Sequence, residues 1–104
     1  GALRAADVSL EAARAGATRE IEQSHAAWQA AAEEYLIVTR EALPLAEDNL
    51  GLLVLAYEAG KEDLLEVLLL QQQALSARRD AVEATTELQR ARTALEQAVG
   101  EELF

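Results

Sequence analysis

The feature that most constrains this chain is a stripe of ten apolar residues in its second half, spaced at alternating steps of three and four. The residues are Val67, Leu70, Ala74, Ala77, Ala81, Ala84, Leu88, Ala91, Leu95 and Ala98. This spacing places them along one side of an α-helix and is the heptad repeat of a coiled coil. Because most of them are alanine, we expect a partner helix to approach closely. The chain contains no alternating apolar and polar run typical of a β-strand.

Gly60 separates this stripe from an earlier helical pattern that begins near Leu3 and ends near Glu58. A glycine fits the left-handed position that commonly ends a helix. Asp63 then suits the N-cap of the second helix, because aspartate accepts hydrogen bonds from the free N–H groups of a first turn. Glu66 follows at the spacing of a capping box. Together these residues predict a sharp turn between two helices.

The predicted fold is all-α: a long antiparallel coiled-coil helical hairpin in a single domain. We expect one helix at about 3–58, a tip turn at 59–62 and a second helix at about 63–99, with Gly100 marking its end. At 1.5 Å per residue the first helix is roughly 80 Å long and the second roughly 55 Å, so the first overhangs the second. Because the apolar pattern resumes beyond Pro44 in the same phase, we expect a kink there and no break.

The first helix carries two apolar seams where a simple hairpin needs one. The first seam consists of Ile21, Ser24, Trp28, Ala31, Tyr35, Val38, Ala42, Leu45, Asn49, Leu52 and Ala56. The second seam, offset by one residue, consists of Ala32, Leu36, Thr39, Leu43, Ala46, Leu50, Leu53 and Tyr57. The second helix carries an extra stripe made of Leu64, Leu68, Leu75 and Val82. This surplus predicts self-association into a larger helical bundle or docking onto another helical protein. The alternative is that these residues form the core of one compact bundle.

The composition argues against several classes of function. With 19 acidic and 9 basic side chains the formal charge is −10, and a nucleic-acid partner would need a basic face. No apolar run approaches the roughly 18 residues that cross a bilayer as a helix, so we expect no direct membrane insertion by this segment. The chain has no Cys, which excludes a disulfide or a thiolate metal site. It also has no Met, so we expect it to be a fragment of a larger protein.

No arrangement of residues suggests catalysis, a cofactor or a metal site. His25 is the only histidine, and its nearest acids, Glu20 and Glu22, lie on the same amphipathic helix, so a solvated or seam-edge position is the simpler interpretation. Glu33 and Glu34 are adjacent and point about 100° apart on a helix, which prevents a paired-carboxylate site. We therefore expect a protein that is not an enzyme.

One charge anomaly surrounds the predicted turn, where Lys61 is the only basic residue among acids. The acids are Glu58, Glu62, Asp63 and Glu66. The simpler interpretation is a capped and solvated helix start, since acids favour the positive end of the helix dipole. The functional interpretation is a ring of negative charge repeated around a pore mouth, which concentrates cations and repels anions. The sequence leaves both interpretations open.

A series of landmarks runs through the second half of the chain. They are Tyr57 and Gly60, Asp63, Glu66-Val67-Leu68, Gln71 to Gln73, Leu95-Glu96 and Ala98-Val99-Gly100. In this order the segment resembles the C-terminal repeat of the TolC-like outer membrane factors, the outer membrane efflux protein family. The upstream residues resemble the earlier part of the same long helix. The acidic composition and the closing residues look more like the heavy-metal efflux branch of that family.

The resemblance implies the periplasmic hairpin of an outer membrane efflux duct, part of a trimeric helical tunnel that docks an adaptor protein at its tip for substrate export. It implies that Ala59, Gly60 and Lys61 contact the periplasmic adaptor protein. It also implies that Tyr57 and Glu66 belong to the region that narrows the pore entrance. The chain would then be the periplasmic portion of a bacterial outer membrane protein. It would self-associate as a trimer in the parent protein, and a fragment could form other oligomers.

Two positions depart from the family pattern. Glu62 stands where relatives have a basic residue, and Leu69 stands where relatives can carry a second acid. The resemblance therefore does not extend to a charge-paired closed tip or to a double acidic ring. The alternative function is a coiled-coil adaptor or scaffold module that binds partner helices, such as the hairpin of a membrane fusion protein. The Arg-Leu-Ser tip characteristic of that hairpin is missing here.

Overall fold

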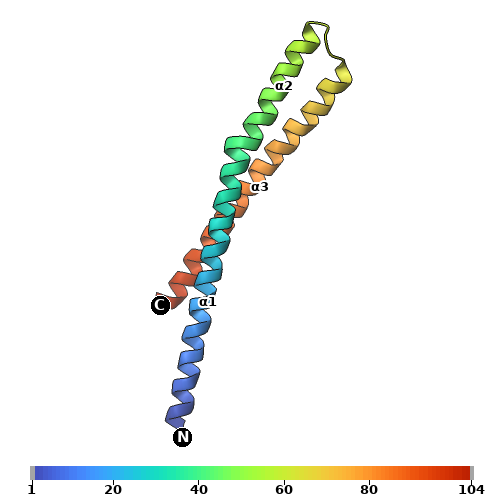
Figure 1. Ribbon diagram of the computed structural model, residues 1–104. Helices are drawn as coiled ribbons and strands as arrows, with labels where there is room; N and C mark the ends of the chain where they lie inside the picture. The colour runs from blue at the N-terminus through green and yellow to red at the C-terminus, as the bar shows by residue number, and fades with distance from the viewer. Residues whose placement is uncertain (1, 104) are drawn as a thin grey trace.

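The chain is almost entirely helical in a computed structural model that describes the backbone of residues 2–103 and the side chains of residues 4–103. Helix α1 spans Ala2–Ile37 and runs through the π-helical segment η1, Val38–Ala42, into helix α2, Leu43–Glu58. After a turn, helix α3 spans Leu64–Leu103. Figure 1 shows α1, η1 and α2 as one long rod and α3 returning beside it in the opposite direction.

The two rods form an extended antiparallel hairpin. The molecule measures 86 × 18 × 14 Å along its principal axes, which is long in one direction and only about two helices thick in the others. In Figure 1, α3 ends alongside α1 and leaves the beginning of α1 without a neighbour. Residues 4–15 are accordingly all exposed. The predicted all-α hairpin with a longer first helix is confirmed.

The core of the hairpin is the alanine-rich stripe of α3. Its most buried members are Val67, Ala74, Ala84, Ala91 and Ala98. The remaining members of the stripe are half-buried. On the opposing rod Ala31 and Val38 are buried. Because these side chains are small, the core is one thin seam, and within residues 4–103 no polar side chain is buried.

The face that the first rod turns toward α3 changes at η1. Upstream and as far as the first residue of η1, the residues of the first seam are buried or half-buried: Ile21, Ser24, Trp28, Ala31, Tyr35 and Val38. Downstream, residues of the second seam are half-buried: Leu43, Ala46, Leu50 and Leu53. Leu45 and Leu52 of the first seam are 62% and 67% exposed. The hairpin therefore buries each seam over one part of its length.

The expectation that the apolar pattern resumes beyond Pro44 in the same phase is wrong. The N–H of Leu43 donates to the carbonyl of Val38, five residues earlier, which is the bond of a π-helix. The reason is local: Pro44 has no N–H to donate, and its ring clashes with the carbonyl four residues earlier, at Arg40. A wider turn relieves that clash, accommodates one extra residue and advances the phase of the helix by one position.

Helix α3 also continues beyond its predicted end. The sequence placed that end near Val99, before Gly100, whereas α3 extends through Gly100 to Leu103. A glycine inside a helix costs only about 1 kcal/mol relative to alanine, so the helix can pass through it. Gly60 differs because its φ of +75° lies in the left-handed region. The backbone angle, and not the residue type alone, separates the glycine that ends a helix from the one that does not.

Candidate functional site at the hairpin tip and flanks

The hairpin tip is a hydrogen-bonded turn. The N–H of Lys61 donates to the carbonyl of Ala56, and the N–H of Gly60 donates to the carbonyl of Tyr57, both at 2.9 Å. This pair of bonds is the Schellman motif, which requires a left-handed residue at the glycine position. Gly60 provides it with a φ of +75°. The turn is therefore shaped by backbone bonds, and its side chains are free for other contacts.

Asp63 closes the other side of the turn by capping α3. Its Oδ1 accepts a hydrogen bond from the N–H of Glu66 at 3.0 Å. Such a bond satisfies one of the N–H groups that have no partner within the first turn of a helix. Glu66 itself lies in that first turn, where a carboxylate interacts favourably with the helix dipole. Both helix ends at the tip are thus capped by residues of the chain itself.

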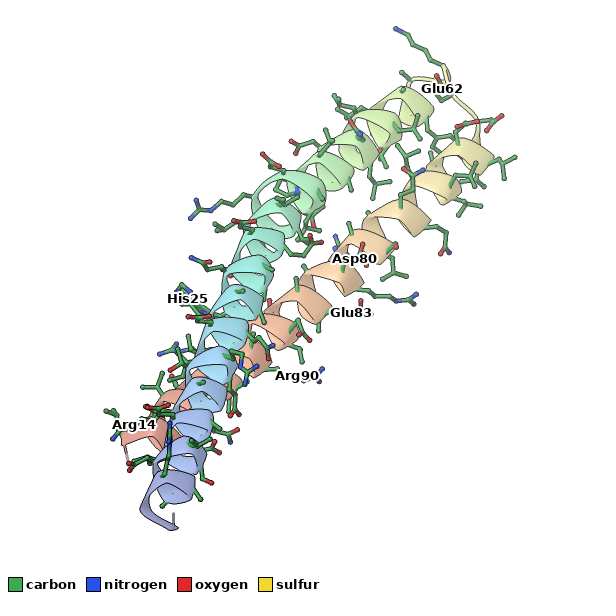
Figure 2. The ribbon with its side chains drawn as sticks, turned by 60° about the horizontal axis from the view of Figure 1, so that its bottom comes forward. Arg14, His25, Glu62, Asp80, Glu83 and Arg90 are labelled. Carbon is green, nitrogen blue, oxygen red and sulfur yellow. The ribbon has the colours of Figure 1, made fainter. Side chains whose placement is uncertain are left out.

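The tip residues that the resemblance singled out are all exposed. Ala59, Gly60 and Lys61 form the apex, while Tyr57 and Glu66 lie on the two arms that lead to it. In Figure 2 the label of the neighbouring Glu62 marks this end of the hairpin. The fold therefore brings these residues together at one end of the rod, with none of them in the core.

Acidic side chains surround Lys61 at this end. The acids Glu58, Glu62, Asp63 and Glu66 are all exposed. The capped-start interpretation accounts for Asp63, through its bond to the α3 backbone, and for Glu66, through its place in the first turn. The ring interpretation requires copies of the chain around a common axis. In the single hairpin these acids are accessible to solvent.

Large apolar side chains lie exposed along both arms near the tip. We name them the apolar flanks: Leu45, Leu52 and Leu55 on α2, and Leu64, Leu65, Leu68, Leu69, Leu75 and Val82 on α3. Figure 2 shows side chains projecting outward around both arms. Single exposed apolar residues are ordinary, but a contiguous group marks an interaction surface. The extra stripe predicted on the second helix belongs to this group.

Two open grooves run between the rods farther from the tip. One, of about 580 Å³, is lined by Trp28, Ala32, Tyr35, Thr85, Leu88, Gln89 and Arg92. The other, of about 340 Å³, is lined by Glu34, Asp80, Glu83, Ala84 and Glu87. They flank the seam on opposite sides, since Gln89 follows the seam residue Leu88 by one position and Glu87 precedes it. The hairpin thus has an aromatic face and an acidic face; Asp80 and Glu83 of the acidic face are labelled in Figure 2.

The rest of the described chain provides little for chemistry. His25 is exposed, with its ring centre 6.0 Å from that of Trp28 and tilted by 37°. Among the described residues no group of histidines and acids could hold a metal ion. None of the helices in the described part of the chain is long and apolar enough to cross a membrane.

Two features escaped the sequence interpretation: the π turn of η1, and the ion pair between Arg78 of α3 and Glu47 of α2, 3.1 Å apart. The sequence does contain a feature that indicates the π turn. Two seams offset by one residue overlap around the position where Pro44 removes a helical hydrogen bond, and one inserted residue connects them. No such feature indicates the ion pair, because the register of two helices is decided by tertiary packing.

Comparison with known proteins agrees with this geometry. A model of the outer membrane efflux protein family matches residues 1–101. Neither the curated proteins nor the solved structures show a match to the chain. The family match supports the TolC-like resemblance carried by the tip landmarks, and it does not distinguish the heavy-metal branch. The extended helical hairpin fits the same assignment. The chain therefore belongs to the outer membrane efflux protein family, a family of transport channels.

Proposed function

We propose that the chain is the periplasmic helical hairpin of an outer membrane efflux duct, where it acts by packing and gating with no chemistry of its own. The family match and the 86 Å length of the hairpin support this proposal. The observation that carries it is the pair of apolar flanks, which the hairpin alone does not cover. A duct wall made of helices packed side by side would cover them.

Lateral packing is the first part of the proposal. The stripe of α3 that consists of Leu64, Leu68, Leu75 and Val82 is between 41% and 66% exposed at each position. Apolar area removed from water contributes about 25 cal/mol per Å², so covering this stripe would stabilise an assembly. We propose a trimer in the parent protein, in which neighbouring hairpins supply the cover.

Adaptor docking at the tip is the second part. Ala59 and Gly60 present backbone and small side chains at the apex, so the helices of a partner can approach closely there, and Lys61 adds a charge. The backbone bonds of the turn and the Asp63 cap hold this shape in advance, which lowers the cost of ordering on binding. Preorganisation of this kind is what a docking site needs.

The pore entrance is the third part. Tyr57 and Glu66 lie on the two arms beside the apex, and both are exposed. With hairpins arranged around an axis, these side chains would narrow the entrance. The acids of the tip would then repeat around it and favour cations over anions.

Crosslinking in the full-length parent protein, expressed together with its adaptor, tests the docking. This segment contains no Cys, so Lys61→Cys places one thiol of known position at the apex. We expect a thiol-reactive crosslinker to join that residue to the adaptor. Arg14→Cys is the matched control, because Arg14 is exposed and lies toward the opposite end of the rod in Figure 2. The control should give no adaptor product.

Tip docking and lateral packing fail separately in this experiment. A parent protein that assembles as a trimer but gives no adaptor product at Lys61→Cys contradicts tip docking and leaves lateral packing standing. A parent protein that remains monomeric in detergent, with its fold intact, contradicts lateral packing.

A further inference from the structure

The change of seam at η1 is the clearest feature that the proposed function does not use. Upstream of it the first seam is buried or half-buried against α3, with Ala31 only 8% exposed. Downstream of it the second seam takes that place from Leu43 to Leu53, while nearest the tip Ala56 of the first seam is half-buried and Tyr57 of the second is exposed. The apolar residues of the first seam nevertheless continue through this region as Ala42, Leu45, Leu52 and Ala56. Helix α2 therefore carries two apolar faces, about 100° apart, for one partner helix.

Pro44 decides which face is used. In a continuous α-helix the carbonyl of Arg40 would clash with the proline ring and would receive no N–H bond from it. In η1 the N–H of Leu43 donates to the carbonyl of Val38, so the turn widens at the point where the helix already lacks a bond. The inserted residue is accommodated most easily at this position, and the second seam comes to face α3.

Helix α2 also faces α3 with side chains that are only half-buried. No residue of α2 is buried, whereas α3 has buried residues along its whole length. The ion pair that links α2 to α3 joins Arg78 and Glu47, whose side chains are 60% and 44% exposed. Figure 1 shows the ribbons of α2 and α3 diverging toward the tip. An arm held in this way can turn about its own axis while α1 stays packed on the alanine stripe.

We propose that α2 docks on α3 in two registers and that the π turn selects between them. With η1 in place, Leu50 faces α3 and Leu45 and Leu52 face outward. When η1 converts to α-helix, α2 turns by about 100°, Leu45 and Leu52 move inward, and Leu50 moves outward. A lateral partner that binds Leu45 and Leu52 stabilises the π register, because it binds one state and not the other. This inference stands whether or not the duct is the parent assembly.

Thiol labelling of single-cysteine variants tests the two registers, since the chain has no Cys of its own. Ala46→Cys reports on the second seam and Asn49→Cys on the first; Ala46 is half-buried and Asn49 is exposed. With Pro44 present, we expect the thiol at position 49 to react faster with a maleimide than the thiol at position 46. Pro44→Ala restores the missing N–H and removes the clash, so we expect the order of the two rates to invert.

A second variant provides the control. Pro44→Ala combined with deletion of Glu41, an exposed residue of η1, removes the insertion and gives a continuous α-helix that returns the second seam to α3. We expect the original order of rates. Labelling that is the same with and without Pro44→Ala overturns the proposal. So does a loss of helicity in Pro44→Ala, measured by circular dichroism, or an inverted order in the deletion variant.

Discussion

Arg78 on α3 reaches across the hairpin to Glu47 on α2, with its Nε 3.1 Å from the Oε1 of the carboxylate. The two residues are 31 positions apart in the chain, so their contact records which turn of α2 lies opposite which turn of α3. Their side chains are 60% and 44% exposed, and water screens the attraction between their charges. The pair marks the register of the arms more than it holds them together.

Arg78→Ala should therefore change stability little. Exposed ion pairs contribute from zero to about 1 kcal/mol. We expect the free energy of unfolding, measured in urea, to decrease by an amount within that range. Arg92→Ala breaks a pair within α3, to Glu96 at 3.1 Å, and is the matched control with a similar expected loss. A loss of several kcal/mol for Arg78→Ala alone would mean that this contact holds α2 against α3.

Gly60→Ala should destabilise the hairpin by about 1–2 kcal/mol, the cost of placing a side chain in the left-handed region. A Cβ at this position would meet nothing within 4 Å, so the cost comes from the backbone angle of +75° and not from a clash. Gly51→Ala, also free of neighbours but inside α2, should stabilise by up to about 1 kcal/mol. Thermal unfolding of both variants measures the difference. Changes of the same sign would contradict this account of the turn.

Ala74→Leu should destabilise the hairpin by about 1–3 kcal/mol, because a larger side chain must separate closely packed helices. Ala74 is 2% exposed, the lowest value among the buried core residues. Ala94→Leu makes the same replacement at an exposed position of α3 and should change stability by no more than about 0.5 kcal/mol. Chemical unfolding compares them. If Ala74→Leu is as harmless as its control, the seam is not closely packed.

Leu68→Gln with Leu75→Gln should reduce self-association and leave the hairpin folded. Both side chains belong to the apolar flanks and are 48% and 41% exposed, so their replacement removes apolar area that a neighbour would cover. Light scattering over a range of concentrations measures the association. Ser76→Gln, at the exposed polar position that follows Leu75, is the control and should behave as the parent chain. Unchanged association in the double variant would exclude this stripe as the contact surface.

Much of the fold could be predicted from periodicity and from the turn. The stripe on α3 has apolar residues at every heptad position from Val67 to Ala98, and a pattern this regular predicts which side of the helix packs against the first rod. Gly60 and Asp63 supplied the chemistry of a helix end and a helix start. Local rules were sufficient here because each residue agreed with its neighbours.

The buried face of the first rod was harder to predict, because its sequence contains two apolar seams that could each face α3. Both seams pass through α2, and the choice between them depends on how Pro44 is accommodated, which is a matter of backbone geometry within one turn. Gly100 presented a similar ambiguity, since a glycine can lie within a helix or end it. In both cases the missing information was conformational and could not be read from the residue types.

The position of the candidate site could be predicted from the sequence, but the molecules that its residues contact could not. A turn between two helices places its residues at an exposed end, so the exposure of Lys61 and of the tip acids follows from the hairpin itself. The roles assigned to Tyr57 and Glu66 depend on neighbouring copies and stay predictions. The sequence of one chain shows which apolar residues remain exposed, whereas the protein that buries them is determined by the assembly.

The alanine stripe of α3 has a further consequence for how the rods come together. Alanine has no side-chain rotamers to lose, so α3 forms most of its contact without any entropy cost from its own side chains. The larger residues of α1, such as Trp28 and Tyr35, must be ordered instead when the contact closes. Most of the side-chain entropy lost when the two rods pack together therefore comes from the first rod and not from α3.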